Sequence, residues 1–450
     1  MERERLGSRL GFILLSAGCA IGIGNVWKFP YITGQNGGGA FVLIYLFFLF
    51  ALGIPAMTME FAMGRASRKS PVRMYRKLAR PGTAWGLHGF MALAGNVILM
   101  MFYTAVTGWM LRYFVDMLSG RFTGLDTKGI EAHFGDLLGA PWPMLMYTVI
   151  VVAVGFAICS IGLQNGLERI TKWMMIALIV IMLVLAGNSF FMAGAAEGLR
   201  FYLLPDFGRM RAIGIGKVIA AAMNQAFFTL SLGIGSMAIF GSYIGNERSL
   251  MGEAVNVAAL DTFVAISAGL IIFPACFSYG VEVSSGPSLI FITLPNIFNH
   301  IPLGRLWGTL FFLFMFFAAF STVLAVFENI IACLIDLTGW SRQKVCLIGC
   351  AGIMLLSVPC ILGFNVWSHI DPFGKGGIQG LEDFIVSNLL LPGGSLIVVL
   401  FCITRYGWGW ENFVKEANKG RGLQVASWMR PYMTYVLPLI VLSILILGLL

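Results

Sequence analysis

The sequence has few charged residues, and this shortage excludes a soluble domain. Charged side chains make up 11% of the 450 residues, less than half of the roughly 25% typical of soluble proteins. Hydrophobic residues make up 58%, and the mean hydropathy is +0.85. Strand-like alternation of apolar and polar residues is absent, whereas apolar runs reach about 20 residues, enough for a spanning helix. The composition therefore predicts an all-α integral membrane protein.

Catalytic and metal-binding signatures are scarce as well. The eight cysteines show no metal-ligand clustering, and we interpret them as buried structural thiols. The four histidines, His88, His133, His300 and His369, lie scattered near predicted span ends and loops. An enzyme needs a convergent nucleophile, base or metal set, so we predict that the protein is not an enzyme. An ion channel is a further alternative, but the sequence shows no selectivity-filter repeat.

The apolar runs predict about eleven spans. The first is retained rather than cleaved, because the N-terminus lacks a small-residue cleavage site and its apolar stretch is too long for a signal peptide. The spans are expected at residues 8–30, 38–64, 86–118, 142–161, 166–193, 214–245, 253–281, 305–337, 343–364, 379–405 and 430–450.

Basic residues set the expected orientation. The segment Arg65–Arg80 holds about seven basic residues and no acidic one. Nucleic acid or anionic lipid are possible partners of such a run, but in a short loop between two spans we interpret it as a topology signal that stays in the cytoplasm. The N-terminus is then cytoplasmic, and the odd number of spans puts the C-terminus outside the cell membrane. Arg200, Arg209 and Arg211 fit this topology less well.

Two spans are interrupted by helix-weakening residues. "GCAIGIGN" (Gly18–Asn25) interrupts span 1, and "SLGIGS" (Ser231–Ser236) interrupts span 6. Backbone groups inside a bilayer need partners, so such breaks are tolerated only within protein or beside a cavity. Breaks at corresponding positions of two halves indicate an inverted-repeat transporter with its site near the midplane. The alternative for span 1 is a GxxxG packing face formed by Gly18 and Gly22.

This pattern predicts a single transporter domain over residues 1–450. It comprises a first repeat, 1–193 (spans 1–5), a second inverted repeat, 213–405 (spans 6–10), and an extra span, 430–450.

Polar groups near the breaks are the candidate ligands. The N–H end of a broken helix suits a carboxylate, and its C=O end suits a cation or an ammonium group. Sodium, a hard cation, needs oxygen ligands. Side-chain oxygens near the breaks are found at Asn25, Thr229, Ser231, Asp261, Ser321 and Thr322. The alternative for the hydroxyls of Ser321 and Thr322 is hydrogen bonding to their own helix.

Ionisable residues within spans are functional candidates by default. They are Lys28, Glu60, Asp261, Glu328 and Asp383. Lys28 and Asp383 lie near predicted outer helix ends, where they can pair with each other or reach water separately. Glu60 and Glu328 are alternatively structural acceptors for backbone donors at the breaks.

At this point the motifs resemble a known family. "GCAIGIGNVWKFPYITGQNGGGAF" in span 1 and "QAFFTLSLGIGS" in span 6 are similar to the neurotransmitter:sodium symporters, specifically their bacterial amino-acid transporter branch with eleven spans. The likeness extends over nearly the whole chain and includes "FITLPNIF" before span 8 and "EDF" in span 10. It implies sodium-coupled import of an amino acid by alternating access, with two Na⁺ sites.

The resemblance also implies the role of individual residues. The first sodium site would use the Ala20 carbonyl, Asn25, Thr229, Asp261 and the substrate carboxylate. The second would use the carbonyls of Gly18, Ile21 and Ala318 with the hydroxyls of Ser321 and Thr322. The substrate carboxylate would meet the amides of Ile23 and Gly24 and the hydroxyl of Tyr103. The substrate ammonium would meet carbonyls near Ala20 and Phe228, and Ser231. The side-chain pocket would be lined by Leu99, Phe228, Ile234, Thr322 and Val326.

The same resemblance implies which residues would open and close access to the substrate site. Phe228 and Tyr103 would form a lid above the substrate. Lys28 and Asp383 would form the outer gate, and Arg3 with Asp336 the inner one.

Two departures from the family pattern lead to further predictions. Lys28 stands where many relatives have arginine, so the gate loses a planar, forked donor. Asp261 stands where many relatives have a neutral asparagine, and its carboxylate predicts chloride-independent transport. The apolar pocket predicts a hydrophobic substrate, and Ile234 leaves room for an aromatic or branched side chain. A proton-coupled amino-acid transporter, with Asp261 or Glu328 as proton carrier, is the alternative.

The expected partners are a small-molecule amino acid and the lipid bilayer, and no nucleic acid. The sequence leaves the oligomeric state and the identity of the amino acid open.

Overall fold

The computed structural model describes residues 4, 6–280 and 287–449, and throughout these residues the regular elements are helices. An isolated bridge between Arg248 and Arg421 is the one strand-like pairing in that part of the chain. Nine of the described helices are long and apolar enough to span a membrane, or up to eleven if two bent pairs are counted as spans. The all-α fold and the number of spans therefore agree with the prediction.

The nine continuous spans include several with π-helical turns. They are Gly39–Ser67 (α3, Gly39–Phe48, and α4, Ile54–Ser67), Gly86–Ser119 (α6), Pro141–Ser160 (α8), Leu163–Ser189 (with α9, Arg169–Ser189), Leu250–Ser278 (α14), Gly304–Thr338 (α16), Arg342–Gly363 (α17), Gly377–Ile403 (α18, Gly377–Phe384, and α19, Leu391–Ile403) and Met429–Leu449 (α21, Met429–Pro431, and α22, Leu437–Leu449). Shorter helices connect them: α5 (Pro71–Leu78), α7 (Thr127–Gly139), α10 (Ala195–Leu203), α11 (Phe207–Ile213), α15 (Leu294–His300) and α20 (Trp410–Ala417).

Span 1 is broken where the sequence predicts it. Helix α1 (Arg9–Ala20) ends at Ile21, which is extended at φ −73° and ψ 102°. The chain continues as the helical stretch Gly24–Gln35, which includes α2 (Phe29–Gln35) and is bent by 55° from α1. The span thus reaches five residues beyond its expected end at residue 30.

Span 6 is broken between α12 (Ile215–Thr229) and α13 (Ser236–Gly241). Three residues of the connection, Ser231, Gly233 and Gly235, have φ values of 51°, 93° and 74°. Glycine adopts this left-handed region without the penalty of a Cβ atom. The glycines therefore allow the helix to be interrupted inside the protein. Helix α12 is also bent by 99° from α11.

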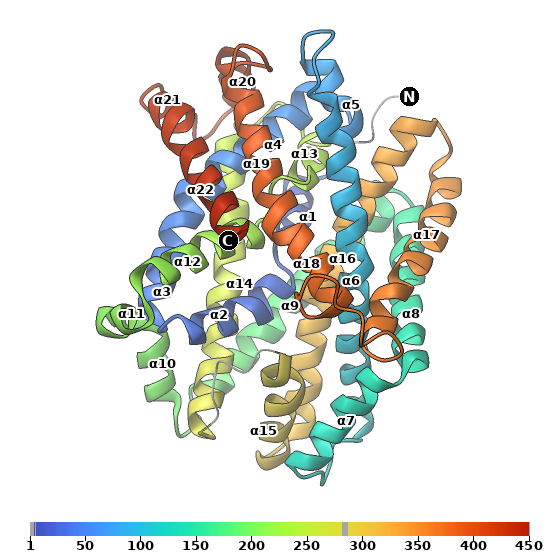
Figure 1. Ribbon diagram of the computed structural model, residues 1–450, viewed down its shortest axis with the longest axis vertical. Coiled ribbons are helices and arrows are strands. Elements are labelled where there is room, and N and C mark those ends of the chain that lie inside the picture. Colours follow the sequence, from blue (N-terminus) through green and yellow to red (C-terminus); the bar gives the residue numbers. More distant parts are fainter. Residues whose placement is uncertain (1–3, 5, 281–286, 450) are drawn as a thin grey trace.

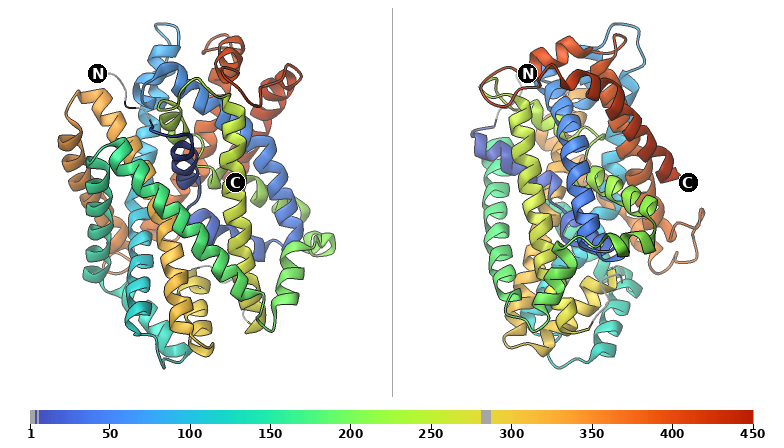
Figure 2. Two further views of the ribbon diagram at one scale, coloured as in Figure 1. Left: turned by 180° about the vertical axis from the view of Figure 1, so that it is seen from behind. Right: turned by 90° about the vertical axis from the view of Figure 1, so that its left-hand side faces the viewer.

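Both broken spans lie inside the bundle. Figure 1 shows the long helices α6 and α16 running through the bundle, with α19 between α22 and α6. Seen from behind in Figure 2, α1 (dark blue) lies between α9 (green) and α14 (yellow). In the most apolar window of α16, 78% of residues are buried, against 28% for the last span. The breaks are enclosed by protein, since Cys19, Ile21, Leu230 and Leu232 are fully buried, and this satisfies the requirement that a membrane places on irregular backbone.

Candidate functional site

Side chains connect the two breaks directly. The Ser231 hydroxyl donates to the Cys19 carbonyl at 3.3 Å, from one break to the other. The Gln225 amide nitrogen donates to the Gly24 carbonyl at 3.0 Å, and this contact was not foreseen from the sequence. Both bonds end on backbone carbonyls of the interrupted span 1, and the Gly24 carbonyl also accepts from the Phe29 amide. The interruptions therefore form one site rather than two separate defects.

A small cavity lies between the breaks. Its volume is about 20 Å³, which is room for about one water molecule. Nine residues that the sequence analysis named line it: Ala20, Gly24, Leu99, Tyr103, Phe228, Thr229, Ser231, Ile234 and Thr322. The wall is completed by Gly22, which the sequence analysis named only as part of a packing face, and by Cys19 and Leu391, which it did not propose for the site. An amino acid therefore enters only when these walls move apart.

One predicted side-chain pocket residue lies elsewhere. Ile23, predicted to contribute its amide, lines a neighbouring outer pocket that also includes Tyr103 and Phe228. Val326 is fully buried in α16 but is not among the residues lining either pocket in the part of the chain described. The resemblance that named Val326 did not show which neighbours would cover its side chain.

A first group of oxygens joins α1 to α16. The Thr322 hydroxyl lies 3.2 Å from each of the Gly18 and Ile21 carbonyls. The Ser321 hydroxyl lies 3.3 Å from the Ile21 carbonyl and 2.9 Å from the Ala318 carbonyl. The structure thus brings together all five residues predicted for the second sodium site. Five converging oxygens fit a hard cation.

A second group of oxygens surrounds Asp261 on α14. The Asn25 amide nitrogen donates to the Asp261 carboxylate at 2.8 Å, and the Thr229 hydroxyl lies 3.2 Å from both carboxylate oxygens. The Asn25 oxygen accepts from the Gly22 amide at 3.2 Å. Ala20, the fourth residue predicted here, lines the adjacent cavity. This arrangement brings the three predicted side chains of the first sodium site into contact.

The charge of Asp261 needs a counterion. Its side chain is fully buried, and among the described residues no lysine, arginine or histidine lies within 4.0 Å of it. Burying an ionised carboxylate with neutral donors alone is costly unless a cation compensates the charge or a proton neutralises it. This group of residues therefore fits either a monovalent cation beside Asp261 or a proton on its carboxylate, and its other oxygen ligands suit a hard cation.

The amide end of the span 1 break faces Tyr103. The Ile23 amide donates to the Tyr103 hydroxyl at 2.9 Å. A Cβ atom on Gly22 would stand 2.3 Å from that hydroxyl and 2.6 Å from the Thr322 hydroxyl, so only glycine fits between them. The second glycine of the motif, Gly22, thus allows the close approach of Tyr103 and Thr322. The tyrosine and the amide are two of the three groups predicted to meet a carboxylate.

Two aromatic residues separate the central cavity from the outer pocket. Tyr103 and Phe228 line both, and the outer pocket has a volume of about 170 Å³. Lys28 and Asp383, the predicted outer gate, lie within this pocket with their charged atoms 3.9 Å apart. The Lys28 ammonium also lies 3.7 Å from the centre of the Phe228 ring, a cation–π distance. The pair therefore stands directly above the proposed lid.

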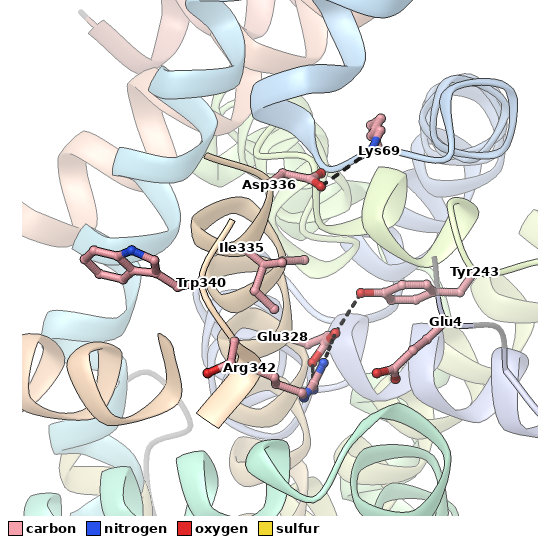
Figure 3. Close-up of a pocket in the computed structure, with 10 residues that line it drawn as sticks. Glu4, Lys69, Tyr243, Glu328, Ile335, Asp336, Trp340 and Arg342 are labelled. Carbon is pink, nitrogen blue, oxygen red and sulfur yellow. Dashed lines mark hydrogen bonds and ion pairs between the residues drawn. The ribbon is translucent and has the colours of Figure 1, made fainter. Parts of the chain in front are cut away.

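The opposite side of the bundle is closed by a network of charges (Figure 3). Asp336 accepts from the Ser70 amide at 2.8 Å and lies 4.0 Å from the Lys69 ammonium. Its predicted partner, Arg3, lies outside the described residues. Glu328 pairs with the Arg342 guanidinium and accepts from the Tyr243 hydroxyl at 2.7 Å. The structure therefore extends the predicted inner gate by a second ion pair.

The two buried glutamates behave differently. Glu60 accepts from the Gly233 amide at 2.6 Å, which confirms it as an acceptor for a backbone donor at a break. Glu328 contacts no break amide among the residues described, and it holds Arg342 and Tyr243 instead. The interpretation of Glu328 as an acceptor for a backbone donor at a break was therefore wrong. Its partner is Arg342, the first residue of α17.

The geometry defines a class: a multi-span membrane transporter with oxygen-lined sites between two broken helices. A profile described as the Sodium:neurotransmitter symporter family matches residues 3–128 and 127–450. The chain belongs to this family and is a sodium-dependent symporter.

Individual relatives agree with this membership. The chain is 36% identical over 394 residues to an uncharacterized sodium-dependent transporter of Bacillus subtilis, YhdH, covering 88% of this chain and 86% of the relative. It is 32% identical over 460 residues to another from Haemophilus influenzae, covering 99% and 98%. It also matches the crystal structure of MhsT in complex with L-phenylalanine, with a TM-score of 0.89, 36% identity and full coverage of both chains.

Proposed function

We propose that this symporter imports a hydrophobic amino acid together with sodium at two sites. The observation that carries the proposal is the buried Asp261 carboxylate, which lies between the two breaks with neutral donors around it. A sodium ion there supplies the missing charge and leaves one face open for the carboxylate of a substrate. Shared contacts of this kind make each ligand raise the affinity of the other, by reciprocal linkage.

The second sodium site would form at the Ser321 and Thr322 hydroxyls. Each hydroxyl now donates its hydrogen to a carbonyl. A cation among these oxygens requires the hydrogens to turn away, so that lone pairs face the ion. The site joins α1 to α16, and its occupancy would therefore hold α1 against that helix.

The substrate would lie in the cavity between the breaks. Its carboxylate would compete with the Tyr103 hydroxyl for the Ile23 amide, and its ammonium would meet the Cys19 carbonyl region and Ser231. Apolar walls, among them Leu99, Ile234 and Leu391, favour an apolar side chain. The bound L-phenylalanine of MhsT supports an aromatic substrate for this chain.

Transport would follow from opening the two sides in turn. The Lys28–Asp383 pair covers the outer side, and the Asp336 and Glu328 networks cover the other. Sodium and amino acid would bind while the outer side is open, and the breaks in spans 1 and 6 would serve as hinges. Because Asp261 supplies a fixed negative charge, we propose that chloride is not required.

Uptake into proteoliposomes tests these proposals. We expect accumulation of labelled L-phenylalanine, L-leucine, L-tryptophan or L-tyrosine with an inward sodium gradient. Replacing sodium with choline at constant pH should stop it, whereas a proton-coupled carrier would continue. Replacing chloride with gluconate should leave the rate unchanged. Failure of all four amino acids to enter or to compete would refute the proposed substrate class.

A further inference from the structure

A second cavity lies behind the substrate site, between spans 3, 10 and 11. Its volume is about 230 Å³. Its wall includes His88 and Met91 of α6, Gly233 and Ile234 of the span 6 break, Gly393 of α19 and Leu445 of α22. Figure 1 shows α19 between α22 and α6 on this side of the bundle. Apart from His88 the lining is apolar, so the cavity suits a hydrocarbon rather than water.

The cavity is reached from the apolar surface of the protein. Met91 is 48% exposed, and its neighbours Leu87 and Phe90 are exposed as well. The last span, which supplies Leu445, is the least buried of the nine continuous spans described. Exposed apolar side chains on spanning helices face lipid. An acyl chain from the bilayer therefore has direct access to the cavity.

Basic residues of α5 lie next to the opening of this cavity. Helix α5 exposes Arg73, Arg76 and Lys77, and the Arg76 guanidinium lies 5.8 Å from the centre of the Phe90 ring. The preceding residue, Tyr75, has its ring 5.2 Å from the ring of His88. These contacts place the positive charge of α5 beside the cavity, within reach of a lipid phosphate. Juxtamembrane basic residues attract anionic lipid headgroups.

We propose that this cavity binds one acyl chain of an anionic phospholipid whose phosphate lies against α5. The site also bears on the substrate pocket, because Ile234 lines both cavities. A chain behind Ile234 prevents that wall from retreating and so preorganises the pocket. This coupling rests on the proposed function, whereas lipid binding itself does not.

A cavity-filling variant tests the binding. A Cβ atom on Gly393 would meet only Leu445, at 3.9 Å, so Gly393→Leu fills the cavity without a backbone clash. The matched control is Gly352→Leu in α17, where a Cβ atom meets nothing within 4 Å. Native mass spectrometry of delipidated protein, titrated with phosphatidylglycerol or with phosphatidylcholine of the same chains, counts the bound lipid.

We expect wild type and Gly352→Leu to bind one phosphatidylglycerol at least about fivefold more tightly than phosphatidylcholine, and Gly393→Leu to lose this site. Arg76→Gln should remove the headgroup preference, and Arg169→Gln, at another exposed arginine, should retain it. Equal binding by the two glycine variants, or equal affinity of wild type for the two lipids, would overturn the proposal.

A second measurement does not depend on the folding of a variant. Phosphatidylglycerol with a photoreactive acyl chain should label the wild-type protein at Met91 or Ala92, within residues 389–397, or at Leu445. Labelling confined to residues that do not line the cavity would overturn the site.

A separate measurement tests the proposed coupling between lipid binding and substrate binding. Phosphatidylglycerol should tighten sodium-dependent L-phenylalanine binding at least about fivefold in wild type and not in Gly393→Leu. Equal dissociation constants in both lipids contradict the coupling. Absence of L-phenylalanine binding in every lipid contradicts the proposed substrate and leaves the lipid titration as the measure of this site.

Discussion

Replacing Asp261 with asparagine removes the charge on which the proposed sodium coupling depends. The side chain is nearly isosteric, and one oxygen remains to accept from Asn25 or Thr229. Two unit charges about 4 Å apart at an effective dielectric constant of about 20 attract by about 4 kcal/mol. The variant no longer has to desolvate a carboxylate, which offsets part of this loss. We therefore expect a net loss of about 1.5–3 kcal/mol in sodium binding.

That loss corresponds to about a ten- to hundredfold rise in the sodium concentration for half-maximal uptake. The assay is amino-acid uptake into proteoliposomes over a range of sodium concentrations, with chloride or gluconate as the anion. Because the wild-type carboxylate supplies the negative charge, we expect chloride to improve only Asp261→Asn. Asp371→Asn, in the exposed loop before α18, is the control for a lost carboxylate. A sodium dependence within about twofold of wild type, with no effect of chloride, would refute the reasoning.

Three further substitutions probe the remaining contacts. Thr322→Val keeps the shape but removes a hydroxyl near two carbonyls, so ²²Na⁺ binding should weaken at least about tenfold. Gly22→Ala places a methyl group 2.3 Å from a tyrosine hydroxyl and should abolish amino-acid binding, whereas Gly187→Ala, in open space, should not. Arg342→Gln leaves the buried Glu328 without its cation and should lower the free energy of unfolding by about 3 kcal/mol, measured by thermal or denaturant unfolding. Unchanged binding in the first two variants, or unchanged stability in the third, would contradict these assignments.

Local sequence was sufficient for the spans and for the position of both breaks. Apolar length decides whether a helix can cross the bilayer, and glycines at Gly18–Gly24 and Gly233–Gly235 mark where the backbone leaves helical geometry. The resemblance in these motifs then supplied ligand candidates. Most of them converge in the structure, because α14 and α16 bring Asp261, Ser321 and Thr322 against the span 1 break.

The packing of the helices decided which residues lie beside the site and the two span breaks. Gln225 and Leu391 belong to no glycine motif, and they reach the site because α12 and α19 pack beside the span 1 and span 6 breaks. Val326 shows the reverse, since it is fully buried and does not line the central cavity.

The sequence by itself thus determined a many-span helical protein with two interrupted helices, because composition and glycine placement act locally along the chain. Which oxygens meet depended on residues about 300 positions apart, as in the contact of Gly18 with Thr322. The same holds for Glu328, which has an arginine as its partner instead of a break amide. Such contacts depend on how whole helices pack, and helix packing is a property of the assembled bundle rather than of any one segment.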